Sequence, residues 1–70
     1  MTVETFIDNR YPNNKGKAHD IKMALIGRGI KLRSKVMKLR IPTVYEIARI
    51  IKVDGPELMK EITDTQTTNA

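Results

Sequence analysis

The sequence predicts an all-α protein, a compact domain built from five short helices. Its 70 residues are enough for one small domain. Apolar residues recur at spacings of three and four, as on the buried face of an amphipathic helix, and helix caps or breakers separate these runs. The domain is expected to cover residues 1–63. Residues 64–70 have no apolar side chain except the last Ala, and they are expected to form a disordered tail.

Two helices are expected in the first part of the chain, over residues 2–9 and 17–25. Thr2 is suited to cap the first helix, whose apolar residues fall at helical spacing. Between the two helices, Pro12 disfavours helical geometry at Tyr11, and the polar residues that follow it are typical of a turn.

A third helix is expected over residues 28–39, after a tight turn at Gly27 and Gly29. As a helix, this segment carries an apolar and a basic stripe about a quarter turn apart. These stripes are Leu32, Val36 and Leu39, and Arg28, Lys31, Lys35 and Lys38. As a strand, residues 30–33 and 37–41 alternate well, but the phase changes between the two. We favour the helix, and a strand or extended piece near 37–41 is the alternative.

Two further helices are expected in the second half. Thr43 and Glu46 form a capping box directly after Pro42, and an amphipathic run follows it. A break at residues 52–55 ends this helix, and Pro56 suits the first position of the last one. The residues expected to form the core are Phe6, Ile21, Leu25, Leu32, Val36, Ile47, Ile51, Val53, Leu58 and Ile62.

Residues 21–45 contain no acidic residue, although the chain has eight Asp and Glu elsewhere. The cations of this segment are Lys22, Arg28, Lys31, Arg33, Lys35, Lys38 and Arg40. Most runs of charge are solvated helix faces, but such faces usually mix both signs. A run of one sign, on a chain of net charge +5, favours a polyanion such as nucleic acid as the partner. An acidic protein would also fit this charge.

The composition argues against several other classes of protein. The chain has no Cys and a single histidine, His19, so a disulfide framework, a structural metal site or a bound cofactor is not expected. His19 and Asp20 have no nucleophile near them, so we do not expect an enzyme. The sequence has no membrane-length apolar run and no start typical of a signal peptide, which favours a cytoplasmic protein that does not bind membranes.

The second half of the chain resembles a known family. The pair Pro42-Thr43 is followed, at fixed spacings, by Ile47-Ala48, Ile51, Val53 and Glu57-Leu58. In this order the segment 42–59 resembles the closing part of Cro/CI-type (lambda-repressor-like) helix-turn-helix domains of phage regulators. The resemblance extends less specifically over about residues 2–62. The turn departs from the family pattern, because no Ser or Thr stands beside either glycine and no Gln precedes them.

The resemblance implies a five-helix fold in which the helix at about 28–38 is the recognition helix that enters the major groove of DNA. By resemblance, Arg28, Lys31 and Arg33 reach bases, and Lys35, Lys38 and Arg40 touch phosphates. Ser34 is either a further phosphate ligand or a residue simply tolerated in the helix. Lys17, in the preceding helix, completes the candidate set.

Two functions follow as expectations. The first is a small phage-type transcriptional regulator that binds operator DNA and controls a repressor or lytic switch, in the cytoplasm of a bacterial host at its nucleoid. The alternative is an antirepressor of the same fold, similar to the modulator of repression of lactococcal phages, which binds the cognate repressor protein. The irregular turn favours this alternative somewhat. A homodimer is expected in the first case, since dimers bind two-fold operators, and dimerisation would also stabilise so small a core.

Overall fold

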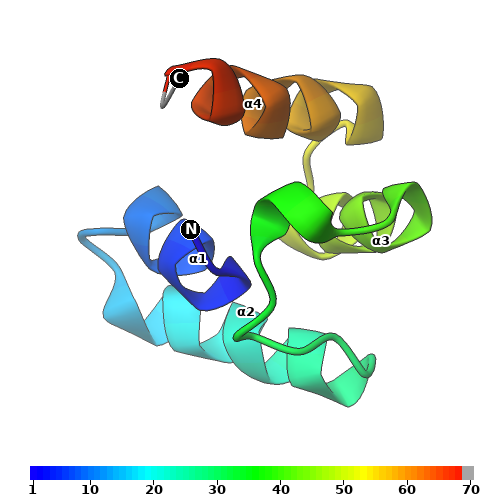
Figure 1. Cartoon of the computed structure of the whole chain (residues 1–70). Coiled ribbons are helices and arrows are strands. Elements are labelled where there is room, and N and C mark those ends of the chain that lie inside the picture. The colour runs from blue at the N-terminus through cyan, green and yellow to red at the C-terminus, as the bar shows by residue number, and fades with distance from the viewer. Residues whose placement is uncertain (69–70) are drawn as a thin grey trace. The chain divides into compact units, whose positions relative to one another are not determined.

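The computed structural model describes residues 1–68, and their side chains as far as residue 64. Within residues 1–68 the regular structure consists of four α-helices, a short 3₁₀ helix and one isolated β-bridge, with no strand. The helices, drawn in Figure 1, are α1 (Val3–Arg10), α2 (Lys15–Gly27), η1 (Val36–Lys38), α3 (Ile41–Ile51) and α4 (Gly55–Thr68). The all-α class is therefore confirmed. The chain divides into two compact units, Met1–Val36 (unit 1) and Met37–Ala70 (unit 2), and each is described by itself.

Helix α1 begins where its cap predicts. The side-chain hydroxyl of Thr2 accepts a hydrogen bond from the N–H of Thr5 at 3.2 Å, and its carbonyl oxygen accepts from Phe6 at 2.9 Å. The first two N–H groups of a helix have no partner within it. Here Val3 donates to the carbonyl of Ser34 and Glu4 donates to that of Leu32, both at 2.9 Å. A segment distant in sequence thus completes the start of this helix.

Helix α2 starts two residues earlier than expected, because Asn14 caps it. The side-chain oxygen of Asn14 accepts from the N–H of Lys17 at 3.1 Å. The helix ends in a Schellman motif, in which the N–H of Ile30 bonds the carbonyl of Leu25 and that of Gly29 bonds the carbonyl of Ile26, at 3.0 and 2.9 Å. Gly29 has a φ of 80°, which glycine adopts without strain. The predicted tight turn is confirmed.

The helix predicted for residues 28–39 is wrong, and so is the five-helix count. Residues 28–35 form a loop, and only Val36–Lys38 is helical, as the 3₁₀ turn η1. The N–H of Ser34 bonds the carbonyl of Lys31 at 3.1 Å, and Lys35 pairs with Thr2 in the isolated bridge. The carbonyls of Leu32 and Ser34 are committed to α1, so they do not accept bonds from residues four positions later. Of the alternative, a strand or extended piece near 37–41, the strand does not form, and the piece between η1 and α3 includes Arg40 in an extended conformation.

In unit 2, α3 is amphipathic as expected, but its start differs from the prediction. The cap position is Arg40, whose side chain makes no cap hydrogen bond, and Pro42 and Thr43 lie inside the first turn. The capping box of Thr43 and Glu46 is therefore not formed. Proline is well tolerated at the start of a helix, because the N–H that it lacks has no partner there. This allows the helix to begin at Ile41.

The break between α3 and α4 falls at the predicted residues. Lys52 ends α3 in the left-handed conformation with a φ of 63°, and its N–H bonds the carbonyl of Ala48. The N–H of Leu58 then bonds the carbonyl of Asp54 at 2.9 Å, as α4 begins. Helix α4 runs as far as Thr68, over part of the tail expected at 64–70, and residues 69–70 lie outside the described residues.

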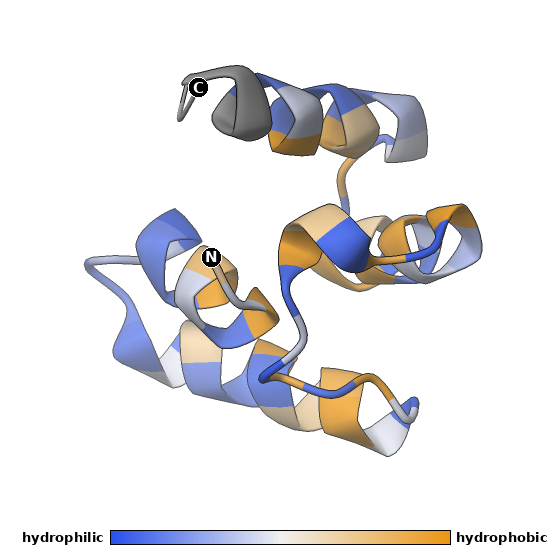
Figure 2. Cartoon of the chain, viewed as in Figure 1, coloured by the Kyte–Doolittle hydropathy of each residue, from blue (hydrophilic) through white to orange (hydrophobic). Residues whose placement is uncertain are grey.

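Each unit buries its own set of apolar side chains. Figure 2 colours the hydrophobic residues along each helix orange. In unit 1 these are Val3, Phe6, Ile7, Ala18, Ile21, Leu25 and Val36, and in unit 2 they are Val44, Ile47, Ala48, Ile51, Leu58 and Ile62. Of the core residues expected from the sequence, only Leu32 and Val53 are half-buried. Within the described part of the chain, no helix is long and apolar enough to cross a membrane.

Candidate polyanion-binding loop

The two units differ sharply in charge. Unit 1 holds eight Lys and Arg against three Asp and Glu, whereas unit 2 holds five of each. The whole net charge of +5 therefore belongs to residues 1–36. Unit 1 therefore has a positive long-range field, whereas unit 2 has no net charge.

The most basic part of unit 1 is the loop of residues 28–35, which we call the basic loop. From Ile30 onward exposure alternates: Lys31, Arg33 and Lys35 are exposed, while the residues between and beside them are half-buried or buried. The half-buried and buried residues are Ile30, Leu32, Ser34 and Val36. This alternation is the pattern of a chain lying against a surface with every second side chain turned to solvent. It replaces the helical stripe of Arg28, Lys31, Lys35 and Lys38, which does not form.

The backbone bonds to α1 fix the position of the basic loop. The carbonyls of Leu32 and Ser34 accept from Glu4 and Val3, and the N–H of Val36 donates to the carbonyl of Met1 at 3.0 Å. The loop is thus tied to the start of α1 at Leu32 and Ser34, and Val36, directly after the loop, is tied to the residue at the start of the chain. Ser34 acts here through its backbone, and its half-buried side chain is not presented to solvent as the three cations are.

The remaining predicted site residues are distributed over other places. Arg28 is the exposed C-cap residue of α2 and the first residue of the basic loop. Lys17 lies near the opposite end of the same helix, about 16 Å away at 1.5 Å per residue. Its ammonium stands over the ring of Tyr11, 5.1 Å from the centroid, in a cation–π contact. Lys38 and Arg40 are exposed but belong to unit 2.

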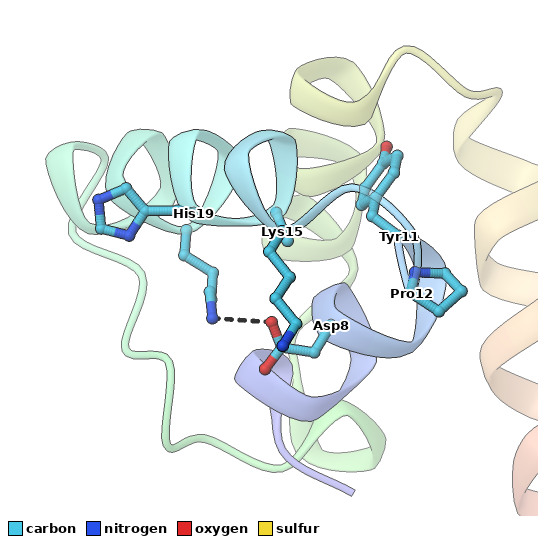
Figure 3. A pocket seen from close by; sticks show the side chains of 7 residues that line it. Asp8, Tyr11, Pro12, Lys15 and His19 are labelled. Carbon is cyan, nitrogen blue, oxygen red and sulfur yellow. Dashed lines mark hydrogen bonds and ion pairs between the residues drawn. The ribbon is translucent and has the colours of Figure 1, made fainter.

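One cation of the acid-free segment is engaged within unit 1. The ammonium of Lys22 lies 2.8 Å from the Oδ1 atom of Asp8, and the Lys22 side chain is only 19% exposed. This ion pair joins α1 to α2 and is drawn as the dashed contact in Figure 3. Lys22 is therefore a weaker candidate for polyanion binding than its place in the sequence suggests.

The same ion pair borders a hollow of about 480 Å³ on unit 1. Tyr11, Lys15 and His19 line it as well, and Lys15 extends toward Asp8 (Figure 3). Sequence reasoning missed this hollow, since the pairing of Asp8 with Lys22 depends on the packing of α1 against α2. Among the described residues, no group of His, Cys, Asp and Glu could hold a metal ion.

Every described cation is at least partly exposed, and no charged side chain is buried within the described residues. The loop therefore offers screened, long-range attraction rather than a desolvated binding pocket. Comparison of the chain with protein-family models, with curated proteins and with solved structures found no match.

Proposed function

We propose that this chain is a small regulator of the phage type that binds double-stranded DNA through phosphate contacts of its basic loop. One observation carries the proposal: the whole net charge lies in unit 1, where Lys31, Arg33 and Lys35 are exposed on a loop tied to α1. Such a regulator acts at the nucleoid of a bacterial host. The likeness of residues 42–59 to lambda-repressor-like domains supports α3 and α4 as counterparts of that family's closing helices.

Recognition in this proposal differs from that of a helix-turn-helix domain. Phosphate contacts position a protein on DNA but carry little sequence information. A loop that lies along the phosphate backbone of DNA, with no helix in the major groove, binds with an affinity that depends strongly on salt and only modestly on base sequence. Arg28 and Arg33 are the residues of the loop best suited to read guanine in a groove.

The second candidate function is the antirepressor. No α-helix forms at the expected recognition position, residues 28–38, and this favours the antirepressor, because no helix is then available to enter the major groove. The basic loop would meet carboxylates on the repressor, and charge complementarity would set the rate and specificity of the encounter.

The test of the first proposal is binding to operator-like and random duplexes at about 50 and about 200 mM salt. The variant Lys31→Ala/Arg33→Ala/Lys35→Ala is compared with Lys52→Ala/Lys60→Ala, which removes exposed cations of unit 2. We expect the slope of log K against log salt to flatten in the triple variant only, by about 0.9 for each phosphate that its side chains no longer neutralise. Equal weakening of binding in both variants would contradict a site on the basic loop.

Adding the cognate repressor separates the two candidates. Weak, sequence-blind binding of DNA by the chain alone, with a tight complex once repressor is present, supports the antirepressor. Binding of duplex that the repressor leaves unchanged supports the regulator. If the triple variant still binds both DNA and the repressor as the wild type does, the basic loop is the binding site for neither.

A further inference from the structure

Helix α3 exposes two large apolar side chains one turn apart. Ile41 is 60% exposed and Tyr45 is 45% exposed, and Met37 just before the helix is 45% exposed. Single exposed apolar residues are ordinary, but a pair at i and i+4 forms a continuous patch on a helix. Arg49 stands one further turn along and is also exposed. We call Ile41, Tyr45 and Arg49 the α3 flank.

The charges of unit 2 are separated between its two helices. Residues 37–52 hold four cations and one carboxylate, and residues 53–68 hold four carboxylates and one cation. In the basic half these cations are Lys38, Arg40, Arg49 and Lys52. On α4, Glu57, Glu61 and Asp64 are exposed at i, i+4 and i+7, and so form one acidic stripe. Unit 2 therefore has no net charge but a basic first half and an acidic second half.

We propose that unit 2 binds a second copy of itself, with the α3 flank of each copy on the acidic α4 stripe of the other. In such a two-fold pair each copy contributes both surfaces, so both contacts form at once and the assembly closes. The apolar pair Ile41 and Tyr45 supplies the buried area, and the opposite charges around it fix orientation. Unit 1 is unsuited to this role, because its net charge of +5 repels a second copy.

A hollow beside the flank offers a place for a side chain of the second copy. It measures about 360 Å³ and includes Tyr45, Arg49, Val53 and Pro56 in its lining. Asp54 also lines it, so the hollow itself is of mixed charge. A pair formed through unit 2 carries two basic loops, and two linked sites bind a polyanion more tightly than one. The self-association does not depend on the proposed DNA binding.

The first experiment is sedimentation equilibrium of the full chain from about 10 µM to about 1 mM, at low and high salt. We expect a monomer–dimer equilibrium that salt weakens. Ile41→Ala should raise the dissociation constant by about tenfold or more, since it removes the most exposed apolar side chain of the α3 flank. Ile26→Ala is the matched control, because Ile26 is similarly exposed at 51% but belongs to unit 1, and it should leave dimerisation unchanged.

The second experiment exchanges the charges. Arg40→Glu/Arg49→Glu makes both surfaces of unit 2 acidic, and Glu61→Lys/Asp64→Lys makes both basic. Each variant alone should be monomeric, and an equimolar mixture should form a heterodimer with one copy of each. Circular dichroism of both variants checks that the helices remain.

Three results would overturn the proposal: a wild-type chain that stays monomeric at about 1 mM and low salt, a dimer that both charge variants leave intact, or a mixture that stays monomeric although both variants are folded. In the first case the α3 flank would be a binding surface for a different protein. In the second case the chain dimerises through another surface.

Discussion

The N–H of Val3 donates a hydrogen bond of 2.9 Å to the carbonyl oxygen of Ser34. This bond, with the parallel one from Glu4 to Leu32, uses the basic loop to complete the start of α1. A backbone N–H at the start of a helix needs a partner from outside it, and carbonyls of the basic loop provide two. The consequence is that residues 28–35 do not form a helix of their own.

We expect Gly29→Ala to destabilise the chain by about 1–2 kcal/mol, because alanine is strained in the left-handed conformation that Gly29 adopts. Gly27→Ala is the matched control, since neither glycine has an atom within 4 Å of an added Cβ. Gly27 is the last residue of α2, so its alanine variant should be more stable, by at most about 0.5–1 kcal/mol, the cost of a mid-helix glycine. Urea unfolding of both variants measures this. Had residues 28–39 formed a helix, Gly29→Ala would stabilise the chain.

Thr2→Ala should lower the free energy of unfolding by about 0.5–2 kcal/mol, since the Thr2 hydroxyl caps α1. The control is Thr5→Ala, which removes only the exposed hydroxyl contact between Thr5 and Thr2 at 3.1 Å. We expect the control to change stability by less than about 0.5 kcal/mol. Thermal unfolding followed by circular dichroism compares the two. An equal decrease in both would mean that the cap contributes nothing beyond the pair of hydroxyls.

Glu4→Gln should strengthen binding to duplex DNA at low salt. The N–H of Glu4 bonds the carbonyl of Leu32 in the basic loop. The backbone of Glu4, from which its carboxylate extends, therefore lies beside the residue between Lys31 and Arg33. Removing this negative charge makes the local potential more positive, an effect that reaches over a Debye length of about 10 Å at about 0.1 M salt. Asp64→Asn, which removes an exposed acid of unit 2, is the control and should have a smaller effect. Titration at two salt concentrations tests this, and weaker binding by Glu4→Gln would contradict the proposed site.

The ring of Tyr45 lies against Gly55, where an added Cβ would be 3.1 Å from the Cγ and Cδ2 atoms of the ring. Gly55→Ala should therefore be less favourable in the wild-type background than in a Tyr45→Ala background. We expect a coupling energy of at least about 0.5 kcal/mol in the double-mutant cycle, as for residues in contact. Unfolding free energies of the four proteins give this value. A coupling of zero would mean that the ring moves aside freely.

Local sequence patterns determined most of the fold. Thr2 as a cap, the glycines after α2, the break at 52–55 and the amphipathic face of α3 are all as expected, because each depends on residues within one or two turns. The starts of α2 and α3 were misplaced, since Asn14 caps earlier than expected and α3 starts without a side-chain cap.

The conformation of residues 28–40 was decided by tertiary structure. Helical and strand periodicities were both present in this segment, and the sequence could not rank a helix against backbone bonds to α1, which lies about 30 residues earlier. The sequence by itself determined how many cations there are and that no carboxylate lies among them. Tertiary structure decided that Lys31, Arg33 and Lys35 share the exposed side of a loop, that Lys22 pairs with Asp8, and that all the net charge belongs to unit 1. The physical reason is that charge is a property of single residues, whereas its presentation depends on which backbone groups find partners across the fold.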